Sequence, residues 1–533
     1  MEGQQPGDVR TNEDLTQATG EGLRWITYAR IVSEVVTLAS MVVLARLIPP
    51  AAFGVFAIVV IAQELAYTVP AEGVGSAIVQ RRSIVRRHLE GGLLLSLGMG
   101  AVLVTVVLIL AEVLVRPVFG DETARLMMIV SPCFLLSSLG AVPSAVLRRR
   151  LDFARLSLID ITATLTRTFA TVGLALAGLD AAALVLGYLT SLVVGVGMAC
   201  AFAPPPLPRW RRREISELLP YGGPATVASL AWTGFRNGDY AIIGATLGPA
   251  QAGFYWRAYQ LAVEYQKKIS TVMAQLAFPV LARTASKAEM LALRRRMVQM
   301  LTVILFPLLA LLVLVAPVAI PWLFGPQWEP AVLPAQILAA GGAATLVIDA
   351  VGPALMAEGR AKALLGYGVG HFVIYAGAVL AVASHGIAAV AIAASAVHGL
   401  FLLIAYQLML GGRLRDAIHS LWIDVRAATL ACAGLVLAAG PTAGALRATE
   451  TPALVHLAAV SVVAAVAYLL VLRVAFPDAA ADLGRIVRRV VPARVLRLVQ
   501  RLGGPVGRVV RRIVPARVLR LVQRLGGPVA ARS

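Results

Sequence analysis

The 533-residue sequence is poor in charged side chains, which make up only 14% of it. Ordinary soluble domains carry about 25% charged residues, whereas 59% of this chain is hydrophobic and its mean hydropathy is +0.80. A water-soluble fold could not bury that much apolar surface, so lipid is the expected solvent. We therefore predict an all-α integral membrane protein, because a helix satisfies its own backbone hydrogen bonds inside the bilayer.

Cysteine is also scarce, and its three copies, Cys133, Cys200 and Cys432, lie inside apolar stretches. This odd, scattered set indicates neither a disulfide framework nor a metal site. The sequence lacks a nucleotide-binding glycine loop, a zinc-ligand spacing and a long polar segment that could form a catalytic domain. We therefore expect no enzyme activity, no cofactor and no metal. Segment 1–21 is polar and lacks the basic start and short apolar core of a cleaved signal peptide.

Acidic residues are outnumbered, and the excess of Lys and Arg gives a net charge of +20. Nucleic-acid binding is one explanation, but such binding gathers basic residues on a soluble domain. Here the basic residues form short runs in alternate loops between apolar segments, which is the pattern that retains loops in the cytoplasm. We therefore expect no nucleic-acid partner.

Apolar segments long enough to cross a bilayer core recur along the chain. We place about fourteen of them, at 22–48, 51–79, 89–115, 124–147, 153–178, 181–203, 218–246, 250–281, 297–320, 331–357, 361–384, 386–410, 421–445 and 451–474. The basic loops lie at 81–87, 148–155, 209–213, 283–296, 360–362 and 413–415. They predict a multi-pass protein of the inner (plasma) membrane with both termini, including segment 1–21, in the cytoplasm.

The two halves of the chain resemble each other. Residues 47–56 (LIPPAAFGVF) align with 246–255 (TLGPAQAGFY), and this alignment pairs Pro50 with Pro249 and Gly54 with Gly253. A second alignment pairs Gly120 with Gly325, and a third joins 142–150 to 352–360. Internal repeats are common in secondary transporters, although Gly- and Pro-rich membrane loops also resemble each other by chance. We expect three domains: an N-terminal six-helix bundle (22–203), a C-terminal six-helix bundle (218–410) and a final helix pair (421–474).

The tail contains a closer repeat. RIVRRVVPARVLRLVQRLGGPVG (485–507) is followed directly by a near-identical copy at 508–530. Apolar residues at helical spacing are interspersed with arginines, so segment 485–530 is predicted to be a basic amphipathic tail suited to the anionic cytoplasmic leaflet. A recent tandem duplication without a function of its own explains the repeat equally well.

Loop and helix-end motifs are spread over both halves. They are LARLIPPAAFGVFAIV (44–59), GVGSAIVQR (73–81), AVLRRRLDFARL (145–156), GFYWRAYQLA (253–262), AFPVLAR (277–283) and LFGPQWEPAV (323–332). Their order and spacing resemble those of the bacterial oligosaccharide flippase, or polysaccharide transporter (Wzx-type), family.

This resemblance implies the fold of the multidrug/oligosaccharidyl-lipid/polysaccharide superfamily, with two six-helix bundles around a central cavity and a final helix pair. It also implies a function, because family members flip polyprenyl-diphosphate-linked oligosaccharides from the cytoplasmic to the external leaflet by alternating access, for surface polysaccharide synthesis. A cation-coupled drug exporter and a lipid II flippase of the same superfamily stay open as alternatives. A membrane scaffold with a basic tail is the alternative that involves no transport.

Ionisable residues inside the predicted spans are the candidates for a transport site, because each is costly in lipid unless it faces a cavity or a partner. Arginine clamps a diphosphate through paired hydrogen bonds, and the candidates for the head group are Arg30, Arg167, Arg236 and Arg257. Polar and aromatic side chains suit sugars, and the candidates for glycan contacts are Asn237, Asp239, Tyr240 and Tyr259. Carboxylates suit coupling to H⁺ or Na⁺, and the candidates are Glu34, Glu64, Asp160 and Asp349.

A structural interpretation exists for each of these residues. Arg30 and Glu34 are four residues apart and can pair on one helix face, and such pairs hold helix bundles together. Lys267 can extend its long side chain to the cytoplasmic edge of the membrane, and His371 and His398 suit packing better than a proton relay. The expected partners are a lipid-linked oligosaccharide, membrane lipids and H⁺ or Na⁺.

Overall fold

The computed structural model describes residues 32–81, 83–264, 286–449 and 451–490, together with positions 266, 267, 270, 277, 281, 283 and 284. Every regular element in these residues is a helix, so the all-α prediction is confirmed for them. The chain divides into two compact units, which we call unit 1 (Met1–Gly253) and unit 2 (Phe254–Ser533). Segment 1–21, Arg30 and most of the tail 485–530 lie outside the described residues.

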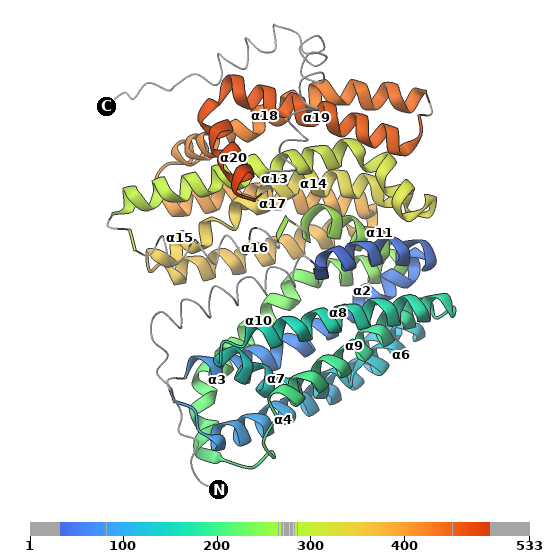
Figure 1. Cartoon of the computed structure of the whole chain (residues 1–533), viewed down its shortest axis with the longest axis vertical. Coiled ribbons are helices and arrows are strands. Elements are labelled where there is room, and N and C mark those ends of the chain that lie inside the picture. The colour runs from blue at the N-terminus through green and yellow to red at the C-terminus, as the bar shows by residue number, and fades with distance from the viewer. Residues whose placement is uncertain are drawn as a thin grey trace. The chain divides into compact units, whose positions relative to one another are not determined.

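Unit 1 consists of long helices that pack side by side (Figure 1). After a helix over residues 32–47, its elements are α2 (Pro50–Pro70), η1 (Ala71–Gly75), α3 (Ser76–Gln80), α4 (Arg86–Leu110), η2 (Ala111–Val115), α5 (Arg116–Phe119), α6 (Asp121–Val130), α7 (Cys133–Arg149), α8 (Phe153–Leu176), α9 (Asp180–Phe202) and α10 (Arg212–Leu247). α8 packs along α9 and α4 along α7, while α2 contacts α6, α7, α9 and α10. α2 is therefore the inner helix of unit 1.

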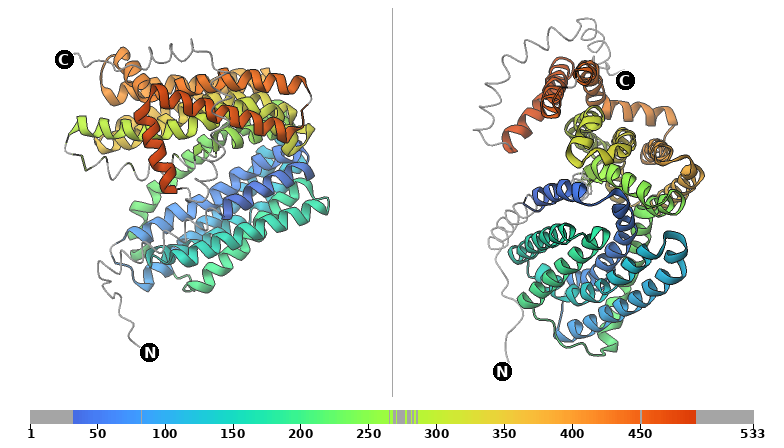
Figure 2. Two further views of the ribbon diagram at one scale, coloured as in Figure 1. Left: turned by 45° about the horizontal axis from the view of Figure 1, so that its top comes forward. Right: turned by 90° about the vertical axis from the view of Figure 1, so that its right-hand side faces the viewer.

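Unit 2 begins at Phe254, inside the helix α11 (Pro249–Tyr259). Its further elements are η3 (Gln260–Glu264), α13 (Lys287–Phe324), η4 (Pro326–Ala331), α14 (Val332–Ile348), α15 (Val351–Ala357), α16 (Ala361–Val382), η5 (Ala383–His385), α17 (Ile387–Leu410), α18 (Leu414–Ala448), α19 (Ala453–Ala475) and α20 (Pro477–Val490). α13 packs against α14 and α18, and α18 against α19. Figure 2 shows α20, in red, leaving the α18–α19 pair at a steep angle.

Ten helical segments in the described residues are long and apolar enough to cross a membrane. This confirms the membrane character of the chain, while the count of fourteen spans stays a prediction. Two of the other four predicted spans, 22–48 and 250–281, lie partly outside the described residues. The remaining two, 153–178 and 218–246, lie in the helices α8 and α10, whose charged and polar side chains lower their hydropathy.

α13 and α18 begin earlier than the apolar pattern predicts. α13 starts at Lys287, where the side chain of Ser286 accepts a hydrogen bond from the backbone N–H of Glu289 at 3.2 Å. Such a cap, followed by good helix formers, starts a helix before the apolar stretch is reached. The arginine run 294–296 therefore lies on a helix and not in a loop. α18 starts at Leu414, where Asp416 Oδ2 accepts a hydrogen bond from the backbone N–H of Arg413 at 3.3 Å.

The aligned glycines of the two halves have matching local structure. Gly120 and Gly325 follow α5 and α13 with dihedral angles of φ 88°, ψ 171° and φ 107°, ψ 158°. A side chain at such a positive φ would be strained, so glycine suits both helix ends.

The other aligned pair makes a direct contact. A Cβ atom added to Gly54 would lie 1.6 Å from the carbonyl oxygen of Pro249, and one added to Gly253 would lie 2.0 Å from that of Pro50. The start of α2 and the start of α11 therefore approach each other at backbone distance, in a contact that is reciprocal between the repeat positions.

Candidate functional site

The inner helix of unit 1 carries an intramembrane carboxylate with a buried amide partner. Asn237 on α10 donates from Nδ2 to Glu64 Oε2 on α2 at 2.8 Å and to the Thr233 carbonyl oxygen at 3.0 Å. Asn237 is buried and Glu64 half-buried. The structure thus brings together one residue predicted to contact the glycan and one predicted to couple an ion.

Two further residues of the predicted site follow Asn237 on α10. Asp239 and Tyr240 are both buried, and Asp239 Oδ1 accepts a hydrogen bond from the backbone N–H of Tyr240 at 2.9 Å. The backbone of Arg236 belongs to α10, but its side chain lies outside the described part of the structure. Asn237 thus contacts α2, and Asp239 contacts the backbone of its own helix.

A second set of polar contacts joins α8 and α9 to the same stretch of α2. The guanidinium of Arg167 lies 5.4 Å from the ring centroid of Tyr188. The Tyr188 hydroxyl lies 3.5 Å from the Gln63 carbonyl oxygen. The Gln63 amide nitrogen is buried without a hydrogen-bond partner, which is unusual for a buried polar group. Arg167, Tyr188 and Gln63 thus lead from the surface of α8 to the residue beside Glu64.

Two predicted residues of unit 1 are accessible on the same helix. Arg167 and Asp160 are both exposed on α8, seven residues apart in sequence. Charged side chains on an apolar helix need water or a polar partner rather than lipid. Glu34 is half-buried on the helix 32–47, and its predicted partner Arg30 lies outside the described residues.

Arg257 of unit 2 is enclosed by aromatic rings. Its guanidinium carbon lies 5.2, 5.4 and 5.5 Å from the ring centroids of Trp328, Trp256 and Phe324, and Nη1 donates to Gln260 Oε1 at 3.0 Å. Arg257 is only 3% exposed and Trp328 is fully buried. Cation–π contacts of this kind are strongest when the cation is desolvated.

The remaining predicted residues of unit 2 lie around η3, directly after α14, and on α16 and α17. Lys267 donates from Nζ to the Tyr259 hydroxyl at 2.6 Å, so this lysine has a polar partner within unit 2. The Ser270 hydroxyl donates to Asp349 Oδ2 at 2.5 Å. His371 and His398 lie with their ring centroids 5.2 Å apart, and His371 also packs 4.6 Å from Phe401. This histidine pair sits among aromatic rings, as in a packing role.

An ion-pair cluster lies at the basic end of unit 1, outside the apolar spans. Glu217 at the start of α10 accepts hydrogen bonds from His88 Nε2 at 3.0 Å and Arg213 Nε at 3.1 Å, and it pairs with Arg81. Because His88 Nδ1 accepts from the Val85 N–H, the ring proton is on Nε2. The hydrogen bond from His88, then that from Arg213 and the charge of Arg81, lower the pKa of the Glu217 carboxyl below its usual value.

Comparison with known proteins identifies the family. A family model described as "Polysaccharide biosynthesis protein" matches residues 43–333, which is more than half of the chain. The chain belongs to the polysaccharide biosynthesis protein family. This family member is 26% identical over 350 residues to the lipopolysaccharide biosynthesis protein WzxC of Escherichia coli (strain K12), covering 65% of this chain and 71% of WzxC. It is also 26% identical over 317 residues to the teichuronic acid biosynthesis protein TuaB of Bacillus subtilis (strain 168), covering 57% and 64%.

Solved structures share the fold of this polysaccharide biosynthesis family member. The lipid II flippase MurJ, in its inward closed conformation, aligns with a TM-score of 0.64 and 12% identity over 85% of this chain and 98% of MurJ. An inward-facing multidrug resistance MATE transporter of the MOP superfamily aligns with a TM-score of 0.55 and 15% identity over 73% and 95%. The predicted superfamily fold is thereby confirmed, while the central cavity stays a prediction.

Among the described residues, the most enclosed ion pair is one that the sequence did not single out. Arg294 on α13 is 2% exposed and donates to Asp424 Oδ2 on α18 at 2.5 Å and to the Tyr406 hydroxyl on α17 at 3.0 Å. Tyr406 donates to Asp424 at 2.7 Å, and Arg295 Nε donates to Asp424 Oδ1 at 2.9 Å. Nothing in the sequence distinguishes Arg294 from the two arginines that follow it. Asp424, in contrast, is a single carboxylate in a predicted span and could have been identified as a candidate.

Proposed function

We propose that this protein flips a polyprenyl-diphosphate-linked oligosaccharide from the cytoplasmic to the external leaflet by alternating access, for surface polysaccharide synthesis. Family membership and the transporter fold support a transporter and not an enzyme. The observation that carries the proposal is the polar path in unit 1, in which exposed Arg167 leads through Tyr188 to α2, where Glu64 meets Asn237.

The residues of this path divide naturally between cargo and ion. Arg167 is accessible and permanently charged, so it suits a diphosphate. Asn237 suits sugar hydroxyls, and Glu64 beside it suits a proton or Na⁺ that is exchanged during the cycle. Arg30, Arg236, Asp239, Tyr240, Arg257 and Tyr259 remain proposed substrate contacts, and Glu34, Asp160 and Asp349 remain proposed ion-coupling residues.

The proposal includes a topology. The protein lies in the inner membrane, and both of its termini are cytoplasmic. Its two helix bundles comprise residues 22–203 and 218–410, and the final helix pair comprises residues 421–474. The basic runs near residues 81–87 and 413–415 support this orientation. Lipid II and cationic drugs are the alternative cargoes, and the names of the curated relatives favour a polysaccharide intermediate over both.

The test is complementation of a deletion strain of the encoding organism. Without the protein, the lipid-linked glycan should accumulate where a membrane-impermeant glycan-modifying reagent cannot reach it in spheroplasts. Arg167→Gln should lower the rate of glycan export about ten- to hundredfold, as expected for the loss of charged hydrogen bonds. Glu64→Gln should lower export and also remove its dependence on the ion gradient.

Arg155→Gln is the matched control, because Arg155 is an exposed arginine at the start of the same helix α8 and pairs with Asp152 at 3.1 Å. It should insert and export like the wild type. Normal surface polysaccharide in the deletion strain, with no second copy of the gene, would overturn the proposed function. Accumulation of lipid II in that strain would show that lipid II, and not the oligosaccharide intermediate, is the cargo.

A further inference from the structure

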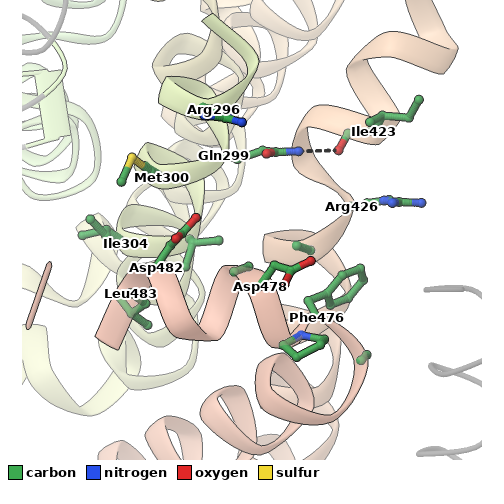
Figure 3. Close-up of a pocket in the computed structure, with 15 residues that line it drawn as sticks. Arg296, Gln299, Met300, Ile304, Ile423, Arg426, Phe476, Asp478, Asp482 and Leu483 are labelled. Carbon is green, nitrogen blue, oxygen red and sulfur yellow. Dashed lines mark hydrogen bonds between the residues drawn. The ribbon is translucent and has the colours of Figure 1, made fainter. Parts of the chain in front are cut away.

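Unit 2 contains a cavity of about 420 Å³ between the N-terminal parts of α13 and α18 and the helix α20 (Figure 3). α13 contributes Arg296, Gln299, Met300 and Ile304, and α18 contributes Ile423 and Arg426. α20 and the residue before it contribute Phe476, Asp478, Asp482 and Leu483. The lining thus combines cationic, acidic and apolar side chains in one cavity.

Two walls of this cavity, α13 and α18, are held together by contacts of their own. The buried contact of Arg294 and Arg295 with Asp424 joins α13 to α18 directly beside it. Gln299 adds a hydrogen bond from Nε2 to the Ile423 carbonyl oxygen at 3.3 Å, which is drawn in Figure 3. A ligand that entered here would therefore meet a preformed site, which reduces the ordering cost of binding.

Three charged side chains of the lining take no part in these contacts. Within the described part of the chain, Arg296, Arg426 and Asp478 form no ion pair, whereas Arg295 pairs with Asp424 and Asp482 pairs with Arg485. Two arginines suit a phosphate group. One carboxylate suits a primary ammonium group. Asp478 would repel a simple phosphate, so the set matches a zwitterion better than an anion.

The position of the cavity matches a lipid. It lies at the arginine-rich ends of α13 and α18, where a membrane helix meets the head-group region. α20 packs Ala479, Ala480 and Leu483 against the apolar cluster of α13, α18 and α19, and exposes Asp478 and Arg485, as an interfacial helix does. Val303, Ile304 and Phe476 supply apolar surface for the first carbons of acyl chains.

We propose that this cavity binds an aminophospholipid of the phosphatidylethanolamine class. Its phosphate contacts Arg296 and Arg426, and its ammonium group donates to Asp478. Phosphatidylglycerol lacks the ammonium group, and phosphatidylcholine has a quaternary one with no N–H to donate. This lipid is a resident of the surrounding bilayer and independent of the flipped cargo, and it ties α20 to the helix pair α13–α18.

The test is thermal unfolding of the full chain, purified in detergent, with phosphatidylethanolamine, phosphatidylcholine, phosphatidylglycerol or inorganic phosphate added. The apparent affinity for phosphatidylethanolamine should exceed that for the other two lipids about tenfold, which corresponds to one charged hydrogen bond. Asp478→Asn should lower the affinity for phosphatidylethanolamine to that for phosphatidylglycerol, and Arg426→Gln should weaken all three lipids together. Native mass spectrometry should show one retained phosphatidylethanolamine, lost in Arg426→Gln.

Arg415→Gln is the control, because Arg415 is exposed in the first turn of α18 and does not line the cavity. Equal stabilisation by phosphatidylglycerol and phosphatidylethanolamine, or an unchanged lipid preference in Asp478→Asn, would overturn the proposal. Stabilisation by inorganic phosphate alone would replace the lipid by a free anion. Binding that appears only after removal of residues 491–533 would make the basic tail the occupant and would equally refute the proposal.

Discussion

The intramembrane charges of the two units differ in accessibility. In unit 1, Arg167 is exposed on α8 and Glu64 is half-buried beside Asn237. In unit 2, Arg257 is enclosed by three rings, and Arg294 is buried with Asp424. In this conformation an accessible charge can meet a solute directly, whereas an enclosed charge also stabilises the fold around it. Loss of Arg167 should therefore lower transport at nearly unchanged stability, whereas loss of Arg257 or of the Arg294 contact should lower stability first.

The largest expected effect comes from Asp424→Ala in unit 2. Removing this carboxylate leaves the guanidinium of Arg294 buried without its charge partner, which costs about 3–5 kcal/mol. We expect most of the protein to be lost from the membrane, as measured by fluorescence-detected size exclusion of a tagged chain. Arg295→Gln is the control, because Arg295 is 42% exposed at its side chain and donates only one bond to Asp424. A stable Asp424→Ala protein would show that enclosure in unit 2 contributes little to stability.

A smaller effect is expected from Arg257→Gln, which sharpens the comparison with Arg167→Gln. Loss of the desolvated cation–π contacts should lower the free energy of unfolding by about 1–2 kcal/mol. Arg167→Gln should leave the thermal midpoint nearly unchanged while it lowers export about ten- to hundredfold. Both can be measured by a thermal-shift assay and an export assay on the same preparations. If Arg257→Gln kept full stability and lost export, Arg257 would belong with the accessible charges of unit 1.

The smallest effect is expected at Glu217, at the basic end of unit 1. Because the folded state lowers the pKa of this carboxyl, its contribution to stability is present above the ordinary value of 4.5 and is lost as pH falls through the lowered value. The difference in thermal midpoint between the wild type and Glu217→Gln should therefore be small and constant near neutral pH, and it should vanish on acidification. A difference that grew below pH 4.5 would contradict this assignment.

The sequence predicted the class of fold well, because about 20 consecutive apolar residues and alternate basic loops follow directly from the bilayer. It also identified Glu64 and Asn237 as functional candidates. It could not show that they touch, since they lie 173 positions apart and helix packing decides which faces meet.

The enclosed charges were harder to predict for a related reason. Arg294 stands in a run of basic residues that resembles a cytoplasmic loop, and nothing local marks which arginine of the three turns inward. Its partner Asp424 is 130 positions away on another helix. Burial of Arg257 likewise depends on Trp328, which reaches it only because η4 folds back after α13.

The contact of Gly54 and Gly253 has a consequence for substitutions at either position. Each glycine faces the carbonyl oxygen of the proline that precedes the other, so residue i meets j as j meets i. This is the isologous relation that a two-fold axis imposes on a homodimer. A methyl group at either position would push the same two backbones apart, so the two glycines do not act independently. Once one substitution has separated the starts of α2 and α11, a second should cost less than it would alone.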